Sequence, residues 1–204
     1  MKPLTLLCAL LSLTLAVDQS FAADPRYPDW PCAQAKVPEI SLAAVWSGPA
    51  LDDAAGNWKA NAKINALVPR LAARRTPIEE AEKIITEFLS HHAAQKAEIG
   101  KLLFAGLFDT LNAQRLSVMN GLERVTRKQR EAADKIRSDT LALQAMQEVS
   151  PPDQAKIEEL GNQLVWQTRI FEDRQRVIKF VCEVPTAIEQ RLFALGRVIQ
   201  QEME

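Results

Sequence analysis

Two long stretches with a heptad pattern, separated by Ser150-Pro151-Pro152, constrain the fold of this chain more than any other feature. Before the prolines, thirteen positions follow an alternating spacing of four and three residues, and ten of them are apolar. Such spacing places side chains along one seam of an α-helix, as in coiled coils. The positions are Phe104, Phe108, Leu111, Arg115, Val118, Leu122, Val125, Gln129, Ala132, Ile136, Asp139, Leu143 and Met146.

The same rule continues after the prolines, so the chain is expected to fold back on itself as an antiparallel helical hairpin. The second seam consists of Ile157, Leu160, Leu164, Gln167, Phe171, Arg174, Ile178 and Val181, followed past Pro185 by Ile188, Leu192, Leu195 and Ile199. Residues that face each other in an antiparallel pair have numbers with a constant sum. Four apolar pairs satisfy one such sum and define the expected register: Leu143 with Ile157, Ile136 with Leu164, Leu122 with Ile178, and Phe108 with Leu192.

The composition agrees with an almost entirely helical protein. Seven glycines and one tyrosine among 204 residues leave little material for strands, whereas strong helix formers are abundant. The apolar clusters at the open end of the hairpin, its base, exceed what two helices can bury. The expected fold is therefore all-α: a long antiparallel helical hairpin (coiled coil) with shorter N-terminal helices packed on its base to form a three- or four-helix bundle.

Within a single helical domain of residues 51–204, helices are expected at about 52–75, 77–99, 101–148, 152–183 and 185–202. Pro69 predicts a kink or break in the first of these helices, near Val68. Thr76, followed by Pro77 and by Glu79, has the pattern of a capping box at the start of the second helix.

Glycines suggest where the long helix is interrupted and where helices come close. A kink or short break is expected near Gly100, because uncapped helices beyond about 25 residues are unusual in globular domains, and a single helix of about seventy residues from Pro77 to Glu148 is the alternative. Gly106 and Gly121 offer places where neighbouring helices can approach closely.

Residues 23–50 are rich in proline and tryptophan and are expected to form an extended arm. Trp30, Trp46 and several aliphatic residues give the arm more apolar surface than a solvated linker carries. We expect it to pack along the helices, and a peptide that docks on a partner is the alternative.

Residues 1–22 have the three parts of a secretory signal peptide: Lys2, an apolar core from Leu4 to Val17, and the small residues Ser20 and Ala22 before a cleavage point. Cleavage is expected after Ala22. An uncleaved membrane anchor is the alternative, although the apolar core is shorter than the ~20 residues of a spanning helix. The mature protein is expected to be exported, to a bacterial periplasm or to the extracellular space, without a transmembrane segment.

Removal of the leader also removes Cys8 and leaves Cys32 and Cys182 as the only cysteines. In an oxidising compartment such a pair is most simply a disulfide, and no Cys-x-x-Cys motif suggests redox or metal chemistry. A bridge across this separation would stabilise the fold by roughly 5 kcal/mol in the chain-entropy model.

Catalytic motifs are not found in the sequence. His91 and His92 are the only histidines, and Glu87 with His91 lacks the second such pair that a di-iron bundle requires. There is no haem-attachment motif, phosphate loop, zinc-protease motif or nucleophile elbow. We therefore expect a protein that is not an enzyme and carries no metal or cofactor.

The middle of the hairpin, residues 123–137 and 169–179, is called the waist below and carries an excess of positive charge. It could contact an anionic partner, or its charges could form a solvated face with intrahelical ion pairs. The candidate contact residues are Arg124, Arg127, Lys128, Arg130, Arg169 and Arg176. Trp166 falls outside the main seam beside Val165 and Ile170, which suggests a contact with a partner or packing against a third helix.

These features predict an exported, non-enzymatic helical protein that acts as a scaffold, an adaptor or a chaperone-like binding module through its hairpin. Its expected partner is another envelope protein or a second copy of itself, and peripheral membrane contact is open. A formal net charge of -1 gives no reason to expect nucleic acid. The alternative is a ligand- or cofactor-binding bundle with a pocket at the aromatic base.

Overall fold

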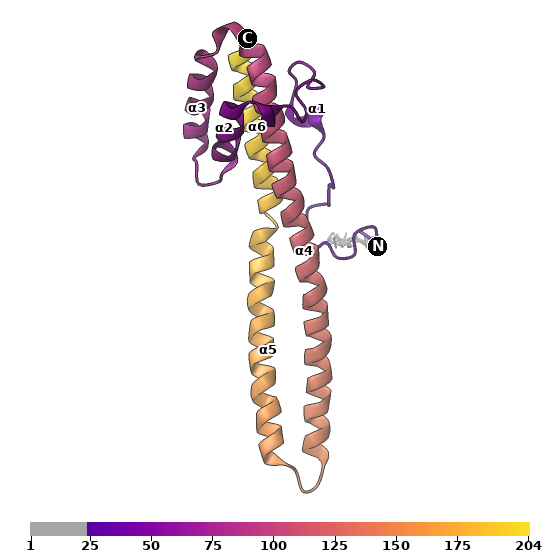
Figure 1. Cartoon of the computed structure of the whole chain (residues 1–204). Helices are drawn as coiled ribbons and strands as arrows, with labels where there is room; N and C mark the ends of the chain where they lie inside the picture. Colours follow the sequence, from indigo (N-terminus) through magenta and orange to yellow (C-terminus); the bar gives the residue numbers. More distant parts are fainter. Residues whose placement is uncertain (1–23) are drawn as a thin grey trace, which may run out of the picture.

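A computed structural model describes residues 24–204, and within this range every regular element is helical. The main elements are the long helix α4 (Lys96–Glu148), the returning helix α5 (Gln154–Val181) and its continuation α6 (Val184–Met203). Figure 1 shows α4 and α5 projecting as a hairpin from a thicker base. The predicted all-α fold is confirmed. The predicted signal peptide of residues 1–22, with Cys8, lies outside the described residues.

The hairpin is long and thin away from its base. Helix α4 has 53 residues, which corresponds to about 80 Å at the rise of an α-helix. Near the middle of the hairpin, the side-chain Nε2 of Gln129 donates a hydrogen bond of 3.0 Å to the carbonyl oxygen of Phe171. This contact between α4 and α5 fits the register expected from the residue numbers.

The hydrophobic core lies at the base, where α2 (Ala62–Ala72) and α3 (Ile78–Ser90) pack against α4 and α6. The arm adds a short helix, α1 (Leu42–Val45), which is followed by Trp46. The ring of Trp46 stacks on Phe104 with 4.2 Å between centroids. The largest fully buried side chains are Phe104, Ile64, Leu71, Ile85, Leu89, Leu103, Leu107, Leu111, Met119, Leu192, Leu195 and Ile199.

Close packing at the base explains two of the glycines in α4. A Cβ atom at Gly106 would lie 2.7 Å from Cγ2 of Val68, which confirms the predicted close approach. A Cβ atom at Gly100 would lie 2.5 Å from Sδ of Met203 at the end of α6. Gly100 therefore lets α4 and α6 pack together, and α4 runs through it without a break.

The break expected near Gly100 occurs instead at residues 91–95, between α3 and α4, so the predicted helix 77–99 is wrong in its last part. The interval contains the short 3₁₀ helix η2 (Ala93–Gln95). The Nδ1 atoms of His91 and His92 each lie 2.7 Å from the backbone carbonyl oxygen four residues earlier. Side chains that bond the last carbonyls of a helix favour its termination, so the two histidines mark the end of α3.

Two further expectations about the N-terminal helices are corrected. In place of one helix at 52–75, the structure has the 3₁₀ helix η1 (Trp58–Ala60) followed by α2. Helix α2 begins after Asn61 because the Asn61 side chain accepts hydrogen bonds from the backbone N–H groups of Lys63 and Ile64 and so caps the helix. Pro69 lies inside α2, which continues past it.

The predicted capping box at the start of α3 is also wrong. The hydroxyl of Thr76 donates to the carbonyl oxygen of Arg70 at 2.9 Å, and Pro77 occupies the N-cap position without a side-chain cap. Thr76 therefore satisfies a carbonyl near the end of α2 rather than an amide of α3.

The base core should carry most of the stability of this fold. Leu192→Ala removes a fully buried side chain and should lower the free energy of unfolding by about 2–5 kcal/mol. The exposed Leu141 near the tip provides the control, and Leu141→Ala should change stability by less than about 0.5 kcal/mol. Urea unfolding followed by circular dichroism measures both, and equal losses would contradict a core confined to the base.

Candidate functional site on the waist of the hairpin

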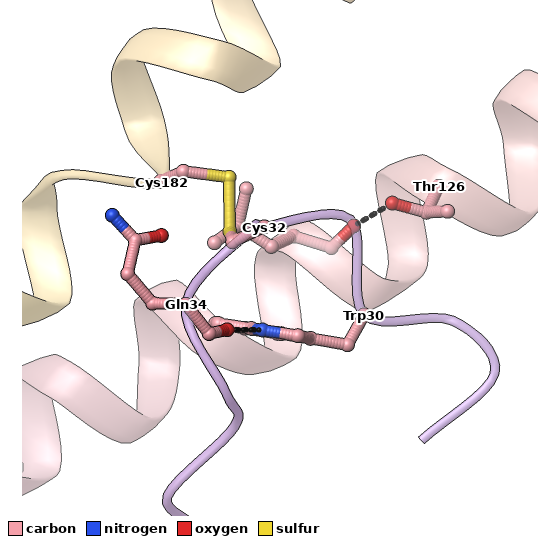
Figure 2. Close-up of a disulfide and its surroundings, with 6 residues drawn as sticks. Trp30, Cys32, Gln34, Thr126 and Cys182 are labelled. Atoms are coloured by element: carbon pink, nitrogen blue, oxygen red, sulfur yellow. Dashed lines mark hydrogen bonds between the residues drawn. A yellow bond between two sulfur atoms is a disulfide. The ribbon is translucent and has the colours of Figure 1, made fainter. Parts of the chain in front are cut away.

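The arm is fastened to the hairpin by the predicted disulfide between Cys32 and Cys182. Figure 2 shows the bridge between Cys182, in the short link after α5, and Cys32 of the arm. Beside the bridge, Trp30 Nε1 donates a hydrogen bond of 2.7 Å to the carbonyl oxygen of Gln34. The disulfide thus holds the arm at the point where α5 gives way to α6.

Arg115 forms a second fastening a short distance toward the base. Only 3% of its side chain is exposed, and its Nε atom pairs with Glu189 of α6 at 2.5 Å. Its Nη2 donates to the carbonyl oxygen of Val37 at 2.6 Å, and Nη1 donates to that of Pro38 at 3.3 Å. This polar seam residue of α4 therefore joins α4 to α6 and to the arm, and its buried charge is satisfied by Glu189 and by the two arm carbonyls.

Three of the six candidate cations for an anionic partner are neutralised within the chain. Arg127 pairs with Asp29 of the arm at 2.7 Å, and Arg130 pairs with the same carboxylate. Arg176 pairs with Asp173, three residues earlier in α5. The hydrogen bond from Arg127, together with Arg130, holds the pKa of Asp29 below its usual value. The two pairs with Asp29 attach the arm to α4, and the pair of Arg176 with Asp173 lies within α5.

The other three candidates, Arg124, Lys128 and Arg169, are exposed and have no ion pair within residues 24–204. Arg174 of α5 is likewise exposed and unpaired among the described residues. With Lys179, which is also exposed and unpaired among the described residues, the waist presents five positive side chains without an ion pair to a potential partner.

An apolar groove of about 400 Å³ runs between α4 and α5 at the level of these cations. It opens where two residues of the predicted seams, Val125 and Arg174, are exposed instead of packed against the opposite helix. A smaller hollow of about 220 Å³ extends it toward the tip and shares Arg174. The larger groove is lined by Val118, Gly121, Leu122, Arg124, Val125, Asp173, Arg174, Val177, Ile178 and Val181.

Helix α5 carries a second set of apolar side chains, which we call the outer seam: Trp166, Ile170, Val177 and Phe180, with Asp173 between them. Their exposed fractions are 64% for Trp166, 42% for Ile170, 58% for Val177 and 72% for Phe180. The spacing is again four-three, one residue before each position of the inner seam. The sequence prediction included only the Trp166 end of this seam, although the heptad spacing of the inner seam, shifted by one residue, contains all four apolar side chains.

The described residues were also searched for a metal centre and for a membrane-spanning helix. Residues 24–204 contain no cluster of three or more histidine, cysteine, aspartate or glutamate side chains able to hold a metal ion. No helix in the same range has the length and apolarity to cross a bilayer. Comparisons of the chain with protein-family models, with curated proteins and with solved structures found no match.

The attachment of the arm to α4 should depend on pH through Asp29. Because the folded-state pKa of Asp29 is lowered, its pairing contributes stability above the unfolded pKa of about 3.9 and loses it as pH falls through the lowered value. Carboxyl carbon NMR should show Asp29 titrating below that reference. The double change Arg127→Gln and Arg130→Gln should raise the pH midpoint of the Asp29 titration. Arg137→Gln, which removes the partner of Asp134, should leave this midpoint unchanged.

Proposed function

We propose that the protein is an exported, non-enzymatic binding module, residing in the periplasm, whose hairpin holds a protein partner of the cell envelope as a scaffold, adaptor or chaperone-like arm. The observation that carries this proposal is the apolar groove at the waist, which lies beside five unpaired cations and away from the base core. A surface of this kind combines apolar area with charges that select a partner.

The rest of the chain supports a mechanical role for the hairpin. Its base is a packed core, and the arm is fastened to it by the disulfide and by Arg115. A structural disulfide also suits an oxidising compartment outside the cytosol. Both histidines bond backbone carbonyls at the end of α3, so the residues best suited to acid-base work have a structural task.

A ligand-binding bundle is the second candidate, and one observation favours it. A hollow of about 410 Å³ lies between the arm and α6 at the base, next to the exposed ring of Phe193. Mass spectrometry of the denatured protein, purified under mild conditions, tests this function. Release of a stoichiometric small molecule would favour it over the proposed binding of a protein partner.

Export gives the first test of the proposal. When the full chain is expressed in a bacterium, the mature protein should be recovered from the periplasm with Ala23 as its first residue. Its intact mass should fall by two hydrogens relative to the reduced form, because Cys32 and Cys182 are bridged. Recovery of the uncleaved chain from the cytoplasm would count against export.

Partner binding gives the second test. The mature protein, immobilised as bait, should retain a defined envelope protein, and size-exclusion chromatography with light scattering should show their complex. The triple change Arg124→Gln, Lys128→Gln and Arg169→Gln should weaken that complex by about tenfold or more, because exposed cations at an interface steer and select partners.

The matched control for this test is the pair Arg137→Gln and Lys156→Gln. Arg137 lies at the end of the waist that is nearer the tip and pairs with Asp134, and Lys156 lies beyond the waist and pairs with Asp153. Neither residue lines the groove or the smaller hollow. This control should leave the complex intact. A mature protein that stays monomeric and retains no partner would refute the proposed function.

A further inference from the structure

We propose that the groove between α4 and α5 receives a third helix, supplied by the partner protein, whose apolar stripe is flanked by acidic side chains. This inference rests on the proposed function and specifies the chemistry of the partner. The docked helix would complete a three-helix bundle around the waist, with the outer seam of α5 and the groove wall of α4 as its receiving surface.

The outer seam is the first reason to expect a helix. Helix α5 packs its inner seam against α4, yet it repeats the heptad spacing one residue earlier on a face with no neighbour among the described residues. Two adjacent apolar seams are the pattern of a helix that packs against two others. From Trp166 to Phe180 the outer seam extends about 21 Å, the length of roughly fourteen helical residues.

Gly121 of α4 is the second reason. A glycine inside a helix lowers stability relative to alanine, and Gly121 stands in the wall of the groove. A Cβ atom at Gly121 would have as its nearest neighbour only Nη2 of Arg124, at 3.9 Å. The chain itself therefore does not use the close approach expected at Gly121, and the space lies in the groove wall, where a partner backbone can come near.

The arm leaves this side of the hairpin open. It contacts α4 through Glu123, which pairs with Lys36, and through Arg127. Each of these residues lies two positions after a groove residue, Gly121 or Val125, and so roughly 200° around the helix. The arm thus covers the opposite face of α4, and no arm residue lines the larger groove.

The positive charge of the groove favours an acidic helix as its occupant over a second copy of the chain. Arg124 and Arg174 line the groove without ion pairs, whereas its lining carboxylate, Asp173, is neutralised by Arg176. A second hairpin placed in the groove would bring another set of waist cations against these arginines, which is unfavourable. A helix with glutamate or aspartate beside its apolar stripe would instead pair with both arginines.

A pair of designed peptides tests this inference on the mature, disulfide-bonded protein. Each peptide has three heptads, about 21 residues, with leucine at the seam positions; one carries glutamate at the flanking positions and the other lysine. Fluorescence anisotropy of the labelled peptides measures binding. The glutamate peptide should bind, its affinity should fall with added salt, and the lysine peptide should not bind.

The protein provides a matched pair of variants for locating the peptide. Gly121→Gln fills the groove wall, whereas Gly161→Gln makes the same change at another mid-helix glycine with no neighbour within 4 Å and outside both hollows. Both changes should improve helix formation. Only Gly121→Gln should lower the affinity for the glutamate peptide, by about tenfold or more. Gly161→Gln should leave this affinity within about twofold of that of the unchanged protein.

Several results would overturn the inference. They are failure of the glutamate peptide to bind, equal binding of the two peptides, or equal effects of the two glycine changes. Sedimentation showing a dimer that Gly121→Gln dissociates would assign the groove to a second copy, and Gly121-dependent binding of anionic phospholipid vesicles would assign it to a membrane. If an envelope protein is retained equally by both glycine variants, the proposed function stands and only the groove assignment fails.

Discussion

The antiparallel seam between α4 and the α5–α6 pair is the contact on which the rest of this structure depends. At the base it is covered by α2, α3 and the aromatic side chains of the arm, so most of its residues are buried. Toward the tip the same seam has only two helices, and its side chains are partly exposed. One continuous packing rule therefore produces a stable base and a slender projection, because burial rather than periodicity sets the stabilisation per residue.

The transition between these two regions is reinforced by covalent and ionic contacts. Cys182 lies in the link between α5 and α6, and its bridge to Cys32 fixes the arm there. Toward the base, Arg115 of α4 pairs with Glu189 of α6 and donates to a backbone carbonyl of the arm. These contacts commit the arm to one side of α4, and the opposite side of the waist remains uncovered. The candidate binding groove is thus a consequence of how the arm is anchored.

Much of the fold could be predicted from the sequence, because the helices and their register depend on the spacing of residues along the chain. Heptad spacing predicts the two helices, and the constant sum of facing residue numbers predicts the register to which the Gln129–Phe171 contact conforms. Local breakers were less informative. Gly100 was interpreted as a helix breaker, but it serves the contact with Met203, and the termination signal lies in His91 and His92. A glycine's role depends on a neighbour distant in sequence, which spacing alone does not identify.

By itself, the sequence determined the helical hairpin, its register, the pairing of Cys32 with Cys182 and the positive character of the waist. Only the tertiary structure decided which waist cations are available, because Asp29 reaches Arg127 and Arg130 across about a hundred residues of chain. It also decided where the seam opens, at Val125 and Arg174, and which face the arm leaves free. The physical reason is the same in each case: local periodicity orients a side chain on its own helix, whereas its exposure and charge balance depend on what packs against that helix from elsewhere.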